Sequence, residues 1–424
     1  MGSRIVGGAA AAAVLLLSAV GVSASPLDLF GFGGRSPGMA GTGVAIATGY
    51  DSVYLNPAGL ADIRHKRLTL GGMYGDFALS MNGADSGTEP ATGMVFGGAL
   101  PIPLGGWMRD RVGFAIGLFV PTAAINRARA PFPGQPTFAL LDSRSEVVGL
   151  QTAVGFRIDR RWRVGVGMLA LAALRGGIDV TTDAAGRFTS KSEEELISYY
   201  TPIVGARYAV PEHDLELGLT FRGVSRSDYD LEVTNDLGDS LPLTIPAILI
   251  AGASQYDPLT LALEAAWRAR PDLTLALQLE YQRWSAFPLP TQNPVAVTIA
   301  QEPPDFHDIV VPRLAAEWRL RDGDGITLAL RGGYWFAMSP APEMSGQQSL
   351  LDNHRHVLSA GLGLGWPGGT VPLYVDLWLQ AHLLAPRRHV KELDQYQPED
   401  QVPFYIMDTS GHILVGGLTV GVDL

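Results

Sequence analysis

Apolar and polar residues alternate along many short stretches of the chain. In the stretch 272–284, one parity carries Leu273, Leu275, Leu277, Leu279 and Tyr281, and the other carries Asp272, Thr274, Gln278, Glu280 and Gln282. Successive side chains of a strand point to opposite faces, so this strand has one apolar and one polar face. The pattern returns at 215–221, 259–267, 326–336 and 371–381. Each stretch has roughly the length that crosses a bilayer as a tilted strand, and together they predict an all-β chain.

Alternation alone fits two architectures. In a soluble sandwich, or a secreted β-protein that binds ligands, the apolar parity faces a core and the polar parity faces water. In a transmembrane β-barrel the apolar parity faces lipid and the polar parity lines the lumen. Other features of the chain have to separate the two.

The start of the chain predicts export. Arg4 precedes an apolar run, 5–22, that ends in the small-residue pattern Val22-Ser23-Ala24. This pattern is typical of a cleaved signal peptide, so residues 1–24 are expected to be removed and Ser25 to begin the mature chain. The alternative is an uncleaved helical anchor. No later window is apolar enough to span as a helix, so any further crossing has to be made by strands.

Composition limits the partners. The formal net charge is −11 and the chain contains no cysteine. An acidic chain without a basic cluster argues against nucleic acid as a partner. The lack of cysteine excludes disulfides and also the lipid anchor that a lipoprotein carries after its signal.

The mature chain divides into two parts. Residues 25–66 lack alternation and are rich in glycine and alanine, which predicts a compact plug, whereas 67–424 contain fourteen candidate strands. Short turns alternate with long loops between these strands, and the predicted long loops are 123–142, 234–255, 285–308, 339–353 and 386–410. Turns at one end and loops at the other are typical of bacterial outer-membrane barrels, so we expect this location.

Three ordered motifs resemble one known family. Residues 51–60 read D-S-V-Y-L-N-P-A-G-L and are similar to the Asn-Pro-Ala motif of the FadL family of outer-membrane hydrophobic-compound transporters. Residues 279–285 resemble the strand of that family that ends in Trp-Ser. The stretch 330–366 resembles its Arg-Ala-Gly-Tyr, Ser-Pro and Pro-Asp-Asn run.

The resemblance implies a fourteen-strand antiparallel transmembrane barrel whose lumen is closed by an N-terminal hatch, here 25–66, with the barrel at 67–424. It implies uptake of long-chain fatty acids or other hydrophobic compounds through a loop groove and a deeper site. Hatch rearrangement and sideways release into the membrane lipid would follow, from a monomer. Asn56, Pro57, Ala58 and Gly59 match the hatch motif; the simpler interpretation is an ordinary Asn-Pro turn.

A gap in the wall requires a strand that stops pairing. In the family the third strand is kinked, and the matching stretch 111–121 offers Gly113, Gly117 and Pro121 as residues that weaken a ladder. The alternative is that these residues only fit the curvature of the wall.

A fatty-acid carboxylate is expected to meet an arginine. Strand parity places Arg222, Arg313 and Arg331 in the lumen, and Arg127, Arg129 and Arg144 lie in a loop near its mouth. The same parity places five acids in the lumen, Glu216, Glu264, Glu280, Glu317 and Asp376, so most lumenal arginines are expected to pair with protein carboxylates.

Apolar loop residues are candidates for the groove that receives the ligand, because exposed loops have little other reason to be apolar. They are Phe132, Phe138, Leu243, Ile245 and Ile248. Packing of loop on loop explains them equally well.

Enzyme, cofactor and metal signatures are not recognised. Gly361-Leu362-Gly363-Leu364-Gly365 lies in a strand and opens no helix, and the pair His354 and His356 lacks a third ligand. The main alternatives to a fatty-acid transporter are a general diffusion porin and a channel for uncharged aromatic hydrocarbons.

Overall fold

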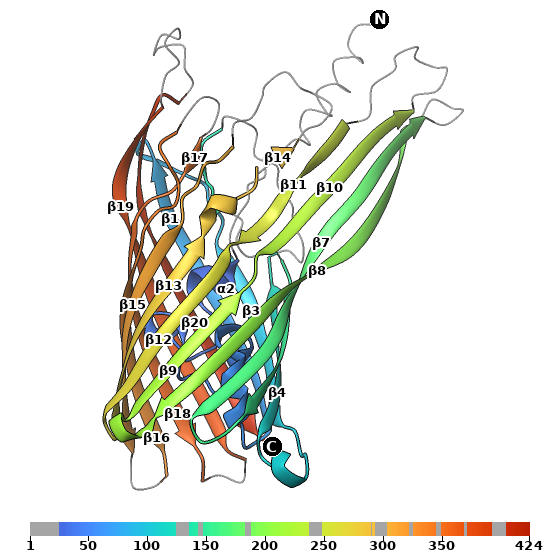
Figure 1. The fold of residues 1–424 in the computed structure, drawn as a ribbon. Coiled ribbons are helices and arrows are strands. Elements are labelled where there is room, and N and C mark those ends of the chain that lie inside the picture. The colour runs from blue at the N-terminus through green and yellow to red at the C-terminus, as the bar shows by residue number, and fades with distance from the viewer. Residues whose placement is uncertain are drawn as a thin grey trace, which may run out of the picture.

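The computed structural model describes residues 25–123, 135–142, 147–182, 188–236, 248–289, 291–292, 303–321, 325–344, 349–368, 371–391 and 404–424. These residues form a closed antiparallel β-barrel of 14 strands (Figure 1). The first wall strand, β1 (Arg67–Met81), pairs along its whole length with the last, β20 (Ile406–Asp423), and this pairing closes the wall. The fourteen-strand antiparallel barrel expected from the sequence is therefore confirmed.

The wall strands follow one another in chain order. Between β1 and β20 lie β3 (Ala91–Pro101), β4 (Val112–Pro121), β6 (Gly149–Arg157), β7 (Trp162–Thr182), β8 (Phe188–Val210), β9 (Leu215–Arg222), β12 (Leu259–Arg270), β13 (Leu273–Arg283), β15 (Ile309–Arg321), β16 (Thr327–Ala337), β18 (Arg355–Trp366) and β19 (Leu373–Val390). Two wall strands are interrupted near the long-loop end. There β9 is followed by β10 (Ser225–Asp236), and β12 is preceded by β11 (Ile248–Asp257). Short strands in the loops are β2 (Ala84–Asp85), β5 (Thr137–Phe138), β14 (Thr291–Gln292) and β17 (Leu350–Leu351).

Side-chain exposure distinguishes a membrane barrel from a sandwich. On β13 the exposed fractions of Leu275, Leu277 and Leu279 are 38%, 49% and 47%, whereas Gln278 and Glu280 are 1% and 4% exposed. Apolar side chains thus face outward and polar side chains face the lumen. Only a lipid environment makes this arrangement favourable for so many strands.

The loops are sorted between the two ends of the barrel as predicted, but two are shorter than the sequence suggests. The predicted loop 234–255 is reduced because β10 extends to Asp236 and β11 begins at Ile248. The predicted loop 386–410 is reduced because β19 continues to Val390 and β20 begins at Ile406. The ends of β10, β19 and β20 concerned here carry many polar residues, which obscures the apolar alternation.

Four strands continue beyond the barrel and lean away from its axis (Figure 1). They are β7, β8, β10 and β11. In this region β10 pairs with β11 on one side and, in parallel, with β7 on the other, from Tyr229 opposite Leu174 to Asp236 opposite Thr181. The strand order there differs from that of the barrel below, where β8 separates β7 from β9.

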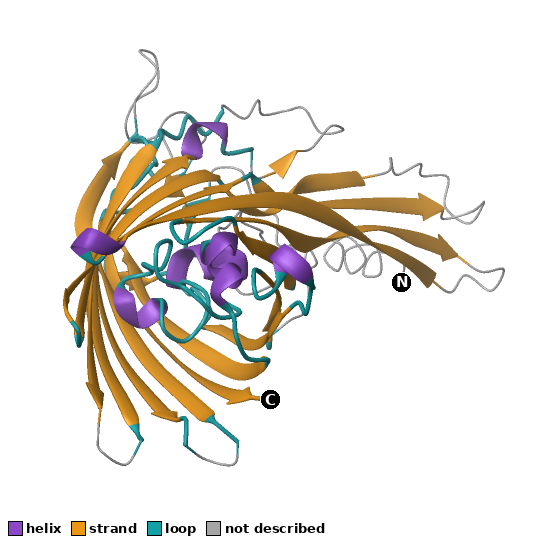
Figure 2. Cartoon of the chain, turned by 60° about the horizontal axis from the view of Figure 1, so that its bottom comes forward, coloured by secondary structure: helices purple, strands orange, loops and turns teal. Residues whose placement is uncertain are grey.

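Residues 25–66, called the N-terminal segment below, lie inside the barrel (Figure 2). The segment contains four short helices, α2 (Pro26–Phe30), η1 (Pro37–Met39), α3 (Ser52–Leu55) and η2 (Pro57–Asp62). Most of its side chains are buried, and Phe32, Val53 and Leu60 pack against Ala115 and Phe119 of β4. No helix among the described residues is long and apolar enough to cross a membrane.

Candidate functional site

Asn56 joins the N-terminal segment to two wall strands. Its Nδ2 donates to the carbonyl of Val44 at 2.7 Å, to that of Ala206 on β8 at 3.1 Å and to that of Leu219 on β9 at 3.4 Å. Its Oδ1 accepts from the backbone N–H of Ala58 at 3.0 Å and so caps η2. The side chain is fully buried. The residues that Asn56 contacts lie far from one another in the sequence, so Asn56 does more than shape a local turn.

A row of glycines in the wall receives this motif. Gly113, Gly155, Gly165 and Gly205 are direct cross-strand neighbours on β4, β6, β7 and β8. A Cβ at Gly113 would overlap the carbonyl of Leu60, at Gly155 and Gly165 atoms of Pro57, and at Gly205 the amide oxygen of Asn56. The absence of four side chains therefore creates the space in which the backbone of η2 lies directly against the wall.

The residues predicted to kink the wall lie in continuous ladders. Strand β4 pairs with β3 from Gly113 to Pro121 and with β6 from Val112 to Phe119, and neither ladder carries a register shift. Gly113 belongs to the glycine row, and a Cβ at Gly117 would meet the ring of Phe32. In this structure both glycines admit the N-terminal segment, and a kink at these positions stays a prediction.

Charged wall residues hold the N-terminal segment in place. The buried carboxylate of Glu264 on β12 accepts from the backbone N–H groups of Gly43 and Val44 at 2.6 and 2.7 Å. Arg207 on β8 donates to the backbone carbonyls of Val44 and Ala47. Within the segment, burial raises the pKa of Asp51, and the nearby guanidinium of Arg35 partly offsets this effect.

The three arginines predicted as ligand partners lie in the lumen, and each has an acidic partner in the protein. Arg222 lies 3.6 Å from the carboxylate of Asp28. Arg313 pairs with Glu280 at 3.2 Å and donates to the carbonyl of Ala40. Arg331 is held between Glu317 at 2.8 Å and Asp376 at 2.5 Å. Lumenal pairing of arginines with acids is thus the arrangement that the structure shows.

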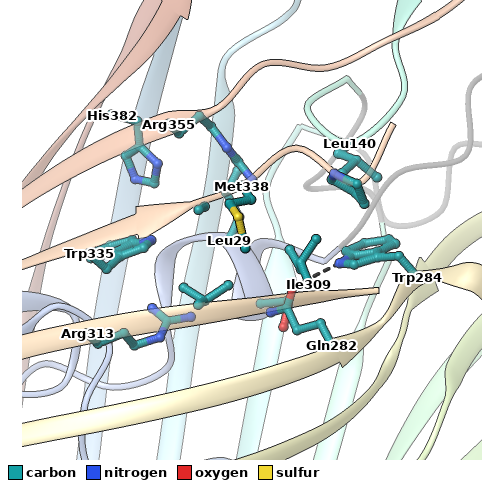
Figure 3. Close-up of a pocket in the computed structure, with 14 residues that line it drawn as sticks. Leu29, Leu140, Gln282, Trp284, Ile309, Arg313, Trp335, Met338, Arg355 and His382 are labelled. Carbon is teal, nitrogen blue, oxygen red and sulfur yellow. Dashed lines mark hydrogen bonds between the residues drawn. The ribbon is translucent and has the colours of Figure 1, made fainter. Parts of the chain in front are cut away.

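A small cavity of about 30 Å³ lies between α2 and the loop-side halves of the strands around it (Figure 3). Leu29 contributes one wall, and Trp284 and Trp335 contribute others. The indole N–H of Trp284 donates to Oε1 of Gln282 at 2.9 Å, which leaves its ring as an apolar surface. The volume is that of about one water molecule, so a larger ligand requires its walls to move.

Arg355, at the start of β18, is a lumenal cation that the sequence analysis does not single out. It lines the cavity, and its Nε and Nη1 atoms are buried without a hydrogen-bond partner. Asp352 and Asp28 attract it electrostatically, but neither bonds to these two atoms. Strand parity was a usable signal, because Arg355 shares the parity of Val357 and Ser359, both of which are buried. The flanking His354 and His356 are exposed.

An aromatic cluster lies beside the cavity, toward the long loops. It consists of Tyr256, Trp284, Phe287 and Phe306, and the rings of Phe287 and Phe306 stack with their centroids 4.4 Å apart. Trp284 belongs both to the cluster and to the wall of the cavity, so the apolar surface is continuous between them.

Of the apolar loop residues predicted to form a groove, Phe138 is the one whose side chain is described. It is 1% exposed and packs with Leu141 and Leu351, and its strand β5 pairs with β17 of another loop. For Phe138 the structure shows packing of loop on loop. Phe132, Leu243 and Ile245 lie outside the described residues, as do Arg127, Arg129 and Arg144, and Ile248 begins β11.

The described part of the chain contains no group of three or more His, Asp or Glu side chains placed to hold a metal ion. The polar side chains around the cavity are one carboxylate, two guanidinium groups, an imidazole, an amide and two indoles, from Asp28, Arg313, Arg355, His382, Gln282, Trp284 and Trp335. The arrangement is suited to binding an apolar molecule with one polar end.

The profile of one protein family, described as outer membrane protein transport protein (OMPP1/FadL/TodX), matches residues 15–377. The chain belongs to this family. Its members are transport channels in the outer membrane that carry hydrophobic compounds, so the location and the coarse function expected from the sequence are confirmed. No curated protein matches the chain by sequence.

Solved structures agree with the fold. A Pseudomonas aeruginosa FadL homologue superposes with a TM-score of 0.60 at 13% identity and covers 96% of this chain and 98% of its own. The toluene transporter TodX of P. putida superposes with a TM-score of 0.56 at 15% identity, and the match covers 94% of this chain and 99% of TodX. The Ralstonia pickettii toluene transporter TbuX superposes with a TM-score of 0.53 at 13% identity, and the match covers 93% of this chain and 99% of TbuX. At these identities the similarity shows the fold of this FadL-family protein and not its substrate.

Proposed function

We propose that this FadL-family protein takes up long-chain fatty acids across the outer membrane and that Arg355 receives their carboxylate. The observation that carries the proposal is the pair of buried, unbonded N–H groups of Arg355 at the edge of a cavity that apolar side chains also line. A buried charged donor without a partner is costly, and a carboxylate satisfies a guanidinium with charge-assisted hydrogen bonds. The acyl chain would contact Leu29, Trp284 and Trp335.

The filled lumen requires a conformational step. The cavity holds about one water molecule, and the N-terminal segment forms one of its walls through α2. We therefore propose that ligand is first collected near the aromatic cluster and that movement of the N-terminal segment then enlarges the cavity. In this scheme the segment acts as a hatch, and release is sideways into the membrane lipid, with the β4 region around Gly113, Gly117 and Pro121 as the expected exit. One chain closes its own barrel, so we expect a monomer.

The test uses uptake of radiolabelled oleic acid in cells that lack their own fatty-acid transporter. The wild-type chain should restore uptake. Arg355→Gln should weaken binding about 10- to 100-fold, because a hydrogen bond to a charged group contributes about 1.5–3 kcal/mol. Arg388→Gln is the matched control, since Arg388 is an exposed arginine paired with Asp408. The proposal is excluded if the wild-type chain fails to restore uptake, or if the Arg355→Gln variant takes up oleic acid as well as the wild type does.

A second candidate is uptake of uncharged monoaromatic hydrocarbons. The stacked pair Phe287–Phe306 and the neighbouring Tyr256 and Trp284 favour it, because aromatic rings pack well against one another. Toluene uptake in the same cells separates the two candidates: Arg355→Gln should leave it unchanged. A general diffusion porin is less well supported, since the N-terminal segment occupies the lumen. Single-channel recordings test it, and a hatch-closed barrel should show little steady current.

A further inference from the structure

The N-terminal segment begins with a buried backbone nitrogen that faces a carboxylate. The nitrogen of Ser25 donates to Oδ1 of Asp257, near the end of β11, at 2.6 Å, although the two residues are 232 positions apart. Ser25 is 3% exposed and Asp257 is 7% exposed. Oδ2 of Asp257 accepts from Nε2 of Gln255 at 3.0 Å. The carboxylate is therefore oriented toward Ser25 by a neighbour on its own strand.

We propose that Asp257 is the binding site for the α-ammonium group of the mature chain. Ser25 is the residue at which the small-residue pattern of the sequence predicts signal-peptide cleavage. Hydrolysis of the bond between Ala24 and Ser25 consumes one water molecule and leaves a carboxylate on Ala24 and an amine on Ser25. Near neutral pH this amine is largely protonated. Processing thus converts a neutral donor with one hydrogen into a cation with three, and the contact with Asp257 becomes an ion pair.

The charges around this contact favour a cation there. Asp28, Asp257 and Glu280 are acids in the same part of the lumen, and Arg222 and Arg313 are the guanidinium groups that pair with Asp28 and Glu280. All three carboxylates act electrostatically on Tyr54 or Arg222. Arg355 is a further guanidinium in this region, where Asp352 and Asp28 attract it. An ammonium at Ser25 adds a positive charge in direct contact with the carboxylate of Asp257.

The contact also determines where α2 lies. The Oγ atom of Ser25 accepts from the backbone N–H of Asp28 at 3.1 Å, and the carbonyl of Ser25 accepts from the N–H of Leu29 at 3.1 Å. Asp28 and Leu29 line the cavity beside Arg355. Cleavage at Ser25 would therefore complete the support of one cavity wall, whichever hydrophobic ligand the protein carries.

The test measures the reactivity of the terminal amine in mature protein purified in detergent. Sequencing of the N-terminus first establishes the residue at which the chain begins, and Ser25 is expected. Reductive dimethylation near neutral pH, read by mass spectrometry, then compares the Ser25 amine with Lys66, an exposed lysine, in folded and in guanidinium-unfolded protein. An ion pair that raises the pKa of an amine by one unit slows this reaction about tenfold, so at least this protection is expected in the folded state.

Asp257→Asn should remove most of that protection, because it keeps the shape of the side chain and removes its charge. Asp308→Asn is the matched control, since Asp308 also accepts from a backbone N–H, that of Ser285, but is exposed. If Asp257→Asn does not fold, insertion of one alanine after Ala24 shifts the amine away from Asp257 and should abolish protection in a folded barrel. A different first residue, equal reactivity in folded and unfolded wild type, or protection that survives both changes would overturn the proposal.

Discussion

Arg35 of the N-terminal segment holds Glu317 of β15 with two hydrogen bonds, from Nε to Oε2 at 2.7 Å and from Nη2 to Oε1 at 2.9 Å. Arg331 donates to the same carboxylate at 2.8 Å, and Arg319 donates to it at 2.7 Å. Glu317 is 1% exposed. One buried carboxylate therefore brings together three guanidinium groups and connects the contents of the lumen to the wall.

Glu317→Gln should destabilise the barrel strongly. The change removes the negative charge that Arg35 binds, whereas Arg331 keeps its second partner, Asp376. Loss of one partner of a buried ion pair costs about 3–5 kcal/mol. Thermal or urea unfolding in detergent, followed by the migration of unheated protein on gels, measures the loss. Asp408→Asn is the control, because Asp408 pairs with Arg388 on the exposed surface and should change stability little. Equal effects of the two changes would show that the Glu317 cluster does not hold the lumen.

Gly165→Ala should displace the N-terminal segment from the wall. The added methyl would overlap Pro57 and Ala58, whereas the wall on either side is fixed by its ladders. Overpacking of this kind costs about 1–3 kcal/mol. We expect higher steady conductance in planar bilayers than for the wild type. Gly72→Ala is the control, since a Cβ at Gly72 points outward and its nearest neighbour is 3.6 Å away. If conductance rose equally in both variants, the close contact between Gly165 and Pro57 would not be what holds the N-terminal segment against the wall.

Asn56→Asp should disturb the N-terminal segment more than Asn56→Ala. Alanine removes the hydrogen bonds, but aspartate also places a negative carboxylate against the carbonyl oxygens of Val44, Ala206 and Leu219, which repel it. Each unsatisfied buried carbonyl costs about 1–3 kcal/mol, and a buried charge adds to this. Hydrogen exchange of residues 43–60 reports the effect. If Asn56→Asp exchanged no faster than the wild type, the amide donor would have no role in holding the segment.

Asp51→Asn should stabilise the protein at neutral pH. Burial raises the pKa of Asp51, so ionisation is less favourable in the folded chain than in the unfolded chain. The contribution of Asp51 to the free energy of unfolding is fully present below its pKa in the unfolded chain, about 3.9. It is lost as the pH rises through the higher pKa of Asp51 in the folded chain. Urea unfolding at pH 3 and pH 7 measures the difference, and the advantage of the variant should appear only at pH 7.

Asp159→Asn should change the stability at neutral pH in the direction opposite to that of Asp51→Asn. Backbone N–H groups of Trp162 and Arg161 lower the pKa of Asp159 in its exposed turn. Its ionised form therefore favours the folded state, and the variant should be less stable than the wild type at neutral pH but not at acid pH. The same direction of change at Asp51 and Asp159 would contradict the account based on burial.

The wall could be predicted because one rule, alternation of faces, acts on every strand. The predicted stretches 259–267 and 272–284 correspond to β12 (Leu259–Arg270) and β13 (Leu273–Arg283), and the outward side of Leu277 follows from parity alone. The parallel pairing of β10 with β7 could not be predicted, because it joins strand ends that are polar and far apart in the chain.

The site could be predicted only in part. The short motif around Asn56 was recognised, and parity placed Arg222, Arg313 and Arg331 in the lumen, but which acid each arginine meets depends on the register of a closed barrel. Arg355 has the same parity signal, but it lies between two histidines, and their spacing on the strand resembles that of metal ligands. The contact of Ser25 with Asp257 depends on tertiary structure entirely, since no local pattern relates residues 232 positions apart.

The filled lumen also has a consequence for how the barrel is assembled. The N-terminal segment emerges first from the chain, yet its carbonyls at Phe30 and Pro37 accept from Gln380 on β19, the next-to-last strand to be made. Its other partners are spread around the circumference, from Gly113 on β4 to Glu317 on β15. The segment cannot be threaded into a finished cylinder and find these partners one at a time. We therefore expect β1 to close on β20 around the N-terminal segment, so that insertion into the membrane and filling of the barrel take place together.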